Sequence, residues 1–316
     1  MRVLVTGAGG FIGARLVEVL RARGRIADKR ISALALADRR LADVAASAVV
    51  LEGDLGSAEM LERVADFRPD IVFHLAAVPG GAAESDYALG RRVNLDTTLA
   101  LFEQLANRER PPVVVYASSI AVYGTGLPAV VTPQTALHPP LTYGAHKLAC
   151  EILLADFSRR GLLDGRSIRL PGIVARPREP SGLASAFMSD LLHAMRAGER
   201  FTCPVSLQAT AWWMSAPCCA ENIAHAATMD VSRAGSARAW PLPVLRLSIA
   251  QVIDACATLF GDDRRELVRF EPNEKLEAVF GRYPPLADTA SRALGLRDDG
   301  SPENLIRRAT GMEQTS

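Results

Sequence analysis

The chain has 316 residues, of which 49% are hydrophobic and 22% are charged, and its formal net charge is +1. A chain of this length can bury a large core in one domain or in two lobes. The near-neutral charge gives no basic field that would hold nucleic acid or an anionic membrane, and neither a signal-peptide pattern nor an apolar stretch of about 18 residues is visible. We therefore expect a globular, cytoplasmic protein that acts on a small-molecule substrate.

Short apolar runs alternate with longer helical patterns in the first half, which is typical of βαβ units and a parallel sheet. We expect strands at residues 2–5, 33–36, 48–51, 71–75, 113–117 and 167–170. We expect helices to begin near Gly13, Ala58, Tyr87, Thr142 and Ala184. The pattern predicts an α/β fold in which residues 1–170 form a Rossmann-type doubly wound parallel sheet.

The alternation loosens after about Arg169, where prolines become frequent. We expect residues 171–316 to form mainly a smaller substrate-binding lobe, with some segments returning to the Rossmann core. The chain has five cysteines without the paired spacing of a zinc site, which indicates buried free thiols, a reducing compartment and no metal centre. They are Cys150, Cys203, Cys218, Cys219 and Cys256.

A glycine-rich string, TGAGGFIG, follows the first apolar run and leads directly into a helical pattern. A strand, glycines at this spacing and a helix, in that order, are typical of a dinucleotide site, and the order disfavours a plain turn. Gly7 permits the tight turn, Gly10 lets backbone N–H groups approach a pyrophosphate, and Gly13 lets the helix pack closely on the strand. Phe11 and Ile12 begin the helix, whose N-terminus would face the phosphates.

Two acidic residues follow the next strands. Asp38 lies where a carboxylate can accept hydrogen bonds from both hydroxyls of an adenosine ribose, which favours NAD over NADP. Arg39 and Arg40 follow, and either guanidinium could instead neutralise a 2′-phosphate, so NADP stays open. Asp54, with Leu55, would lie near an adenine amino group, although a simple Asp turn explains Asp54 nearly as well.

The fourth expected strand ends in His74, Leu75, Ala76 and Ala77. The small residues after His74 leave room for pyrophosphate and nicotinamide at the strand ends. No other metal-ligating side chain stands at ligand spacing beside His74, which favours a hydrogen-bonded core histidine over a metal ligand.

Tyr143 and Lys147 are four residues apart and share one face of a predicted helix. A free tyrosine titrates near pH 10, so its use as a base near neutral pH requires a nearby cation, which Lys147 can supply. An exposed surface pair is the alternative interpretation. Upstream, a buried strand delivers Ser119 to the same edge of the sheet, where its hydroxyl can orient the reacting oxygen; Ser118 could serve only the backbone.

Together these residues make the chain resemble the extended short-chain dehydrogenase/reductase superfamily, also called the NAD-dependent epimerase/dehydratase superfamily. The resemblance adds Asn94, in the string NLDTT, and Pro171, in the string RLP, to the other motifs. It implies that Ser119, Tyr143 and Lys147 form a catalytic triad, that Asn94 and Lys147 contact NAD, and that Pro171 lies beneath the nicotinamide. It also implies a homodimer that pairs helices near residues 97–106 and 143–157, although the apolar residues of the second helix fit intrachain packing equally well.

Nucleotide-sugar epimerases and dehydratases of this superfamily carry an arginine for the substrate's diphosphate, and here the corresponding stretch, AWWMSAP, has none. Several strings instead resemble the D-erythronate dehydrogenase branch, among them ESDY, SSIAVYG and SRRG. That resemblance implies NAD-dependent oxidation of a small sugar acid at its 2-hydroxyl group. A carboxylate needs a cationic or N–H-rich partner, for which Arg169 and Arg176 are candidates, although either could instead be a structural hydrogen-bonder. Trp213 and its neighbour Trp212 predict an apolar pocket wall.

Two other functions remain as alternatives. A nucleotide-sugar epimerase or dehydratase would retain its NAD through turnover, whereas a dehydrogenase would release NADH. A dinucleotide-sensing protein without catalysis would have no need of Ser119, Tyr143 and Lys147 together.

Overall fold

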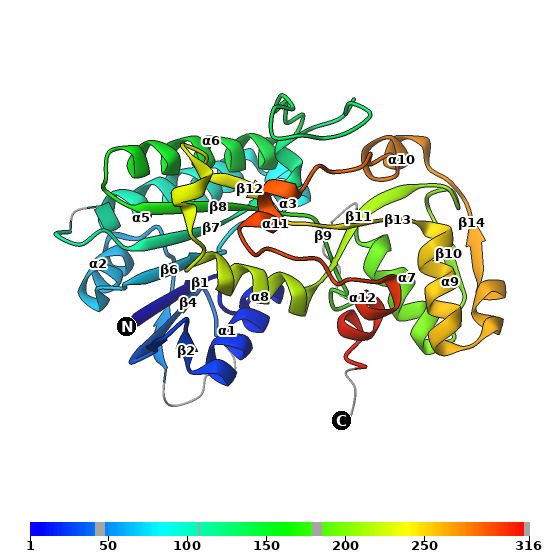
Figure 1. The fold of residues 1–316 in the computed structure, drawn as a ribbon, viewed down its shortest axis with the longest axis horizontal. Coiled ribbons are helices and arrows are strands. Elements are labelled where there is room, and N and C mark those ends of the chain that lie inside the picture. The colour runs from blue at the N-terminus through cyan, green and yellow to red at the C-terminus, as the bar shows by residue number, and fades with distance from the viewer. Residues whose placement is uncertain (42–47, 107, 179–184, 313–316) are drawn as a thin grey trace.

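The computed structural model describes residues 1–41, 48–106, 108–178 and 185–312 (Figure 1). Seven parallel strands form its larger sheet, in the order β12-β8-β7-β6-β1-β4-β5. The strands are β1 (Arg2–Thr6), β4 (Ala33–Asp38), β5 (Val49–Glu52), β6 (Ile71–His74), β7 (Val113–Ser119), β8 (Asp164–Leu170) and β12 (Ala239–Pro241). The order runs outward in both directions from β1 and β6, which confirms the predicted doubly wound α/β fold.

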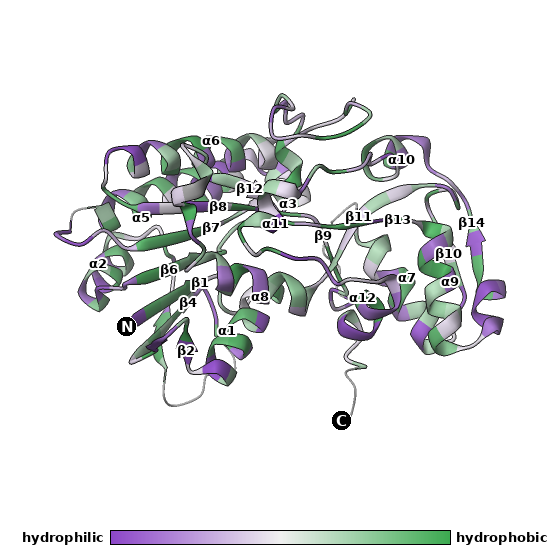
Figure 2. Ribbon diagram, in the orientation of Figure 1, coloured by the Kyte–Doolittle hydropathy of each residue, from purple (hydrophilic) through white to green (hydrophobic). Residues whose placement is uncertain are grey.

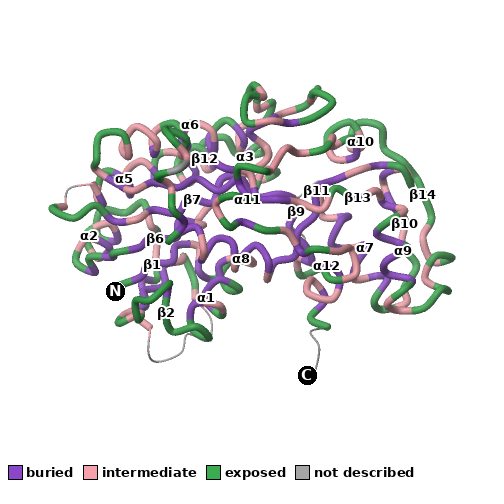
Figure 3. Tube along the Cα trace, in the orientation of Figure 1, coloured by how far each residue is buried: buried purple, intermediate pink, exposed green. Residues whose placement is uncertain are grey.

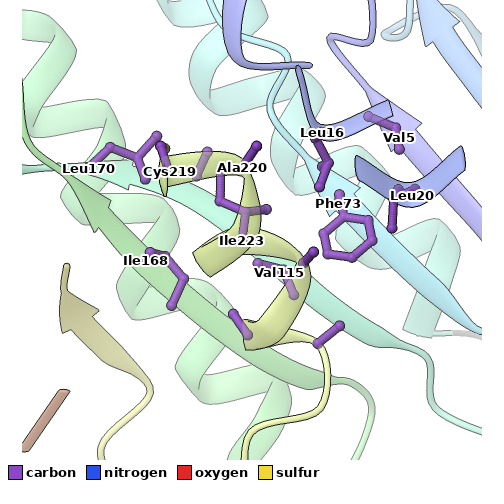
Figure 4. Packing of buried hydrophobic residues seen from close by; sticks show 14 of the residues in the cluster. Val5, Leu16, Leu20, Phe73, Val115, Ile168, Leu170, Cys219, Ala220 and Ile223 are labelled. Carbon is purple, nitrogen blue, oxygen red and sulfur yellow. The ribbon is translucent and has the colours of Figure 1, made fainter. Parts of the chain in front are cut away.

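Helices cover both faces of this sheet, so its central strands β4, β1, β6 and β7 are buried on both sides and are largely apolar (Figure 2). On one face lie α2 (Ala58–Phe67), α5 (Thr97–Ala106) and α6 (Thr142–Arg159), and on the other lie α1 (Phe11–Arg23) and α8 (Ala216–Ala226). Figure 4 shows Leu16 and Leu20 of α1 and Ile223 of α8 packed over Phe73 and Val115 of the sheet.

The second lobe has an apolar core of its own, and burial is continuous through the centre of both lobes (Figure 3). A three-stranded sheet contains β9 (Gly172–Val174), β11 (Thr210–Ser215) and β13 (Leu245–Ser248), and β10 (Phe201–Cys203) pairs with β14 (Val268–Phe270). The helices of this lobe are α7 (Phe187–Ala197), α9 (Ile249–Phe260), α10 (Glu274–Phe280) and α12 (Pro302–Ala309).

Shorter elements complete the description. They are the hairpin of β2 (Arg25–Ile26) and β3 (Lys29–Arg30), α3 (Gly80–Ser85), α4 (Tyr87–Arg91), a π-helical turn (Arg92–Asp96), α11 (Thr289–Ala293), and 3₁₀ turns at Ile120–Val122, Val231–Ala234 and Asp262–Leu267. None of the described helices is long and apolar enough to cross a membrane.

The two lobes meet where β8 continues into β9 through Pro171. β9 leaves the large sheet and pairs with β11, with Gly172 opposite Trp213. After β11 the chain returns to the large lobe, because α8 packs against α1 and β12 pairs with β8. The carboxyl edge of the large sheet therefore faces the three-stranded sheet across a cavity.

The six expected strands lie within a few residues of six strands of the large sheet, whose seventh strand, β12, was not predicted. This strand has only three residues and ends in Pro241, so it carries too little apolar pattern to be visible in the sequence. The helix expected near Gly13 begins at Phe11, and Ala184 lies outside the described residues, where the next described helix begins at Phe187. All five cysteines are buried and free, as expected.

Candidate active site

One cavity of about 560 Å³ lies between the two lobes. The glycine loop and the ends of β6, β7 and β8 form the wall that we call the floor. The start of β9, β11, α7 and the segment around Tyr283 form the opposite wall, which we call the roof. The predicted site residues that line the cavity are Gly7, Gly10, Phe11, Ile12, Gly13, Leu75, Ala77, Ser119, Tyr143, Lys147, Pro171 and Arg176.

The glycine loop has the shape that a dinucleotide needs. Gly7 has a φ of +69°, which strongly favours glycine. A Cβ on Gly13 would lie 2.0 Å from the carbonyl oxygen of Gly7, so helix α1 can pack this closely only on a glycine. No side chain caps α1, and its first turn carries no acidic residue. The N–H groups of that turn are left for an anion, so the loop fits the pyrophosphate of a dinucleotide.

Asp38 and Asp54 lie outside the cavity lining. Asp38 ends β4, and its carboxylate accepts the N–H of Gly9 in the glycine loop at 2.9 Å, which fixes the carboxylate beside that loop. Asp54 accepts the N–H of Gly56 at 3.0 Å and pairs with Arg92 at 3.0 Å. Asp54 therefore forms an Asp turn, which the sequence had left open as the alternative to adenine binding. Its carboxylate is bonded to Gly56 and Arg92.

His74 is fully buried, with both ring nitrogens hydrogen-bonded. The Thr98 hydroxyl donates to the carbonyl of Asn94, so it accepts from Nε2 of His74 at 3.0 Å, and the Thr6 hydroxyl donates to Nδ1 at 2.7 Å. Burial, aided by the charge of Lys147, lowers the pKa of His74 to about 3, so the ring is neutral. The prediction of a hydrogen-bonded core histidine is confirmed.

Asn94 supports the cavity from behind without lining it. Its side-chain amide exchanges two hydrogen bonds with the backbone of Val78, at 2.7 and 3.0 Å. Leu75 and Ala77 line the cavity just before Val78, and the backbone of Ala76 between them packs against Gly7. Asn94 therefore fixes the loop after β6 at the position where a nicotinamide would lie.

The catalytic candidates come from two elements of the floor. Ser119 ends β7, its hydroxyl oxygen accepts the N–H of Ala121 at 3.1 Å, and the hydroxyl lies within hydrogen-bond reach of Tyr143. Tyr143 and Lys147 lie one turn apart on α6, and Nζ of Lys147 donates to the carbonyl of Ala117 at 2.8 Å. The ammonium lies 5.5 Å from the centre of the Tyr143 ring. The structure thus brings the three predicted residues to one cavity.

Burial governs the titration of this group. It raises the pKa of Tyr143, and the charge of Arg176 and the hydroxyl of Ser119 oppose that shift. It lowers the pKa of Lys147 to about 8, although Cys150 and Glu151 act in the opposite direction. Two cations, Arg176 and Lys147, therefore lie near the phenol, where the sequence had predicted one.

Arg169 does not line the cavity. Its guanidinium donates to both carboxylate oxygens of Glu151, with the shortest distance at 2.7 Å, and to the hydroxyl of Tyr123 at 3.1 Å. Burial alone would lower the pKa of Arg169, but Glu151 and Tyr123 outweigh it and raise the pKa. Ser118 also donates to Glu151. This buried network ties β7, β8 and α6 together beneath the catalytic candidates, and no sequence pattern indicated the pair of Arg169 with Glu151.

Trp213 points away from the cavity. It is fully buried in the second lobe, where its indole N–H donates to the carbonyl of Leu247 at 3.3 Å. Trp212 lines the cavity instead, together with Tyr283, because successive residues of β11 face opposite sides of the sheet. The prediction of an apolar wall holds for Trp212, whereas Trp213 belongs to the core behind it. Strand alternation could have separated the two, but the sequence did not show which face was inward.

Comparisons with known proteins agree with this geometry. The model of the NAD dependent epimerase/dehydratase family matches residues 3–232. The chain is similar to the D-erythronate dehydrogenases of Cupriavidus necator, at 38% identity over 97% of each chain, and of Haemophilus influenzae, at 31% identity over 98% of each chain. Among solved structures it is similar to the nucleoside-diphosphate-sugar epimerase from Agrobacterium tumefaciens, with a TM-score of 0.93 and 33% identity over 99% of this chain and 94% of that one.

Proposed function

Because the chain belongs to the NAD dependent epimerase/dehydratase family, we propose that it is a dehydrogenase that oxidises a small sugar acid, D-erythronate or a close relative, at the 2-hydroxyl group. The observation that carries the reaction class is the convergence of Ser119, Tyr143 and Lys147 on the cavity that the glycine loop also lines. The similarity to two D-erythronate dehydrogenases over nearly the whole chain supports the substrate.

Each polar group of the floor would have a separate role in the oxidation of an alcohol. The glycine loop would hold the pyrophosphate of NAD, and NAD supplies the hydride acceptor when bound. The Ser119 hydroxyl donates to the substrate oxygen and orients it. Burial raises the pKa of Tyr143 and the charge of Arg176 opposes that shift, so the phenolate that takes the hydroxyl proton needs the further stabilisation that Lys147 would supply. The same residues would return the proton if the enzyme worked in the direction of ketone reduction.

We propose NAD as the cofactor because Asp38 lies beside the glycine loop at the end of β4, where a carboxylate recognises the two hydroxyls of an adenosine ribose. A 2′-phosphate at that position would meet the negative charge of Asp38. Arg39 and Arg40 follow Asp38 directly and are exposed, so activity with NADP is part of the test.

The cavity also favours a small substrate over a nucleotide sugar. Among the described residues that line it, the cations are Lys147 and Arg176, and we assign the charge of Lys147 to the phenolate of Tyr143. The two phosphates of a nucleotide sugar would leave more negative charge than one remaining cation can balance. The single negative charge of a carboxylate would balance the one positive charge of Arg176.

The proposal is tested by incubating the purified chain with NAD or NADP and a panel of four- and five-carbon sugar acids that includes D-erythronate, while nicotinamide absorbance is followed. Accumulation of NADH with D-erythronate is the expected result. The proposal fails if no sugar acid yields NADH and the chain instead converts UDP-glucose into its epimer without net reduction of the cofactor. The chain would then be a nucleotide-sugar epimerase, as the Agrobacterium tumefaciens protein is named.

A further inference from the structure

The backbone of Arg176 is fixed at the mouth of the cavity. Arg176 follows β9, its N–H donates to the hydroxyl of Ser189 at 2.9 Å, and its carbonyl lies 2.6 Å from Nε2 of His193. Both partners are on α7, a helix with a largely buried face. The side chain of Arg176 therefore enters the cavity from an anchored position.

The guanidinium group of Arg176 lies near both the glycine loop and the phenol of Tyr143. Its central carbon is 5.2 Å from the ring centre of Phe11, at the start of α1. On the substrate side it interacts with Tyr143: burial lowers the pKa of Arg176, and the phenol opposes that shift. A ligand held by this guanidinium would lie beside the catalytic phenol.

Within the described part of the chain, no carboxylate pairs with Arg176. Arg169, seven positions earlier, has Glu151 as its partner, and the acidic residue of the cavity wall, Glu84, accepts the N–H of Thr142 at 2.9 Å. A partly buried guanidinium without an acidic partner loses hydration that it does not regain from the protein. A ligand anion bound to the guanidinium would compensate for this lost hydration.

We propose that Arg176 binds the substrate's carboxylate and makes the site selective for 2-hydroxy acids over neutral alcohols. This inference rests on the proposed function, which it deepens by naming the residue that reads the acid group. A guanidinium presents two parallel N–H groups that match the two oxygens of a carboxylate. With the carboxylate on Arg176, the hydroxyl on the adjacent carbon is the one nearest to Tyr143 and Ser119.

The other anion that could reach Arg176 is the cofactor's pyrophosphate, because Phe11 belongs to the glycine loop. The unpaired N–H groups in the first turn of α1 already supply donors for the pyrophosphate. Arg176 lines the same cavity as Ser119 and Tyr143, so a substrate bound there can also reach it. The experiment must therefore separate substrate affinity from cofactor affinity.

The test uses the chain carrying Tyr143→Phe and saturated with NAD, so that ligands bind without being oxidised. Calorimetry measures the Kd of D-erythronate, L-threonate and D-glycerate, and of the neutral amide of each acid. The measurements are repeated after adding Arg176→Gln and, as a matched control, Arg178→Gln. Arg178 is two residues away and pairs with Glu199 on the surface at 2.6 Å.

We expect at least one acid to bind about 10- to 100-fold more tightly than its amide when Arg176 is present, in line with a charge-assisted hydrogen-bonded pair. Arg176→Gln should bring that ratio close to one and leave the Kd of NAD unchanged, and Arg178→Gln should preserve the ratio. The inference is overturned if no acid is preferred, or if the preference survives Arg176→Gln. A loss of NAD affinity with a surviving preference would assign Arg176 to the cofactor.

This outcome is separable from that of the proposed function. The Kd ratios are read without turnover and over three acids, so an acid preference that depends on Arg176 would stand even if the wild-type chain did not oxidise D-erythronate. Conversely, the chain could form NADH from D-erythronate while its preference for the acid over the amide is unchanged by Arg176→Gln. That result would uphold the proposed function and refute this inference.

Discussion

The floor and the roof of the cavity differ in how their polar side chains are held. On the floor, Lys147 and Ser119 are each bonded to backbone groups, and Glu151 pairs with Arg169 beneath them. On the roof, Trp212 offers an apolar surface, and Arg176 has no acidic partner among the described residues. The floor is thus organised before any ligand arrives, whereas the roof leaves its charge for the ligand.

The largest effect is expected from a change on the floor that removes the proposed base. Tyr143→Phe keeps the ring and deletes the hydroxyl, so we expect turnover to fall by about 10³- to 10⁴-fold while NAD still binds. Steady-state kinetics and NAD calorimetry on the same preparation would show both effects. Activity within tenfold of the wild type would mean that another group of the floor moves the proton.

The buried ion pair beneath the floor should contribute strongly to stability. Glu151→Gln leaves the buried charge of Arg169 without its counter-ion, so we expect the free energy of unfolding to fall by about 3–5 kcal/mol. Asp54→Asn is the matched control, because its pair with Arg92 is exposed and should contribute at most about 1 kcal/mol. Equal losses in urea unfolding of the two variants would show that the floor is not held by this pair.

Lys147 gives a prediction about pH. Its pKa is lowered from 10.5 to about 8 in the folded chain, mainly by burial, so the unfolded state binds more protons between these values. The folded state therefore carries a penalty that is full below about pH 8 and disappears as the pH rises toward 10.5. Lys147→Met should be more stable than the wild type at neutral pH, by up to about 3 kcal/mol.

The measurement is urea unfolding of both chains across this range of pH. The stability advantage of Lys147→Met should shrink as the pH rises, and taking the difference between the two chains removes the contributions of other groups that titrate in the same window. An advantage that stays constant with pH would contradict the lowered pKa of Lys147.

Asp38 should give the smallest effect. Asp38→Ala removes the carboxylate beside the glycine loop, and we expect NAD to bind about tenfold more weakly, in line with the loss of hydrogen bonds to a charged group. NADP should lose less affinity or gain some, because a negative charge leaves and Arg39 and Arg40 remain. Kd values for both cofactors, measured side by side, check this, and a parallel loss for both would refute ribose recognition by Asp38.

Much of the floor was predictable because each of its residues lies at the end of a strand or within one helical turn of its partner. The glycine loop begins where β1 ends, Ser119 ends β7, and Tyr143 and Lys147 are one helical turn apart. In a parallel sheet the carboxyl ends of all strands lie at one edge, so identifying the strands was enough to bring these residues together. The start of α1 differed by two residues, which did not affect the site.

The roof was less predictable because its parts come from distant segments. Which of Trp212 and Trp213 faces the cavity depends on how β11 pairs with β9 and β13. Tyr283 reaches the cavity from a segment about seventy residues further along, where its ring packs at a tilt against Trp212 with centres 4.8 Å apart. No local pattern encodes such contacts. Likewise β12 is too short for its return to the large sheet to be read from composition.

The two arginines show where the sequence alone stops. Sequence by itself determined the parallel α/β fold, the dinucleotide loop and the Ser119, Tyr143 and Lys147 set, because periodicity and strand ends are local properties. It offered Arg169 and Arg176 as equal candidates for the carboxylate. Only the tertiary structure separated them, since it buried Arg169 against Glu151 on α6 and left Arg176 in the cavity. Whether a charge is free for a ligand depends on which residues fold against it, and that is decided by packing rather than by position in the chain.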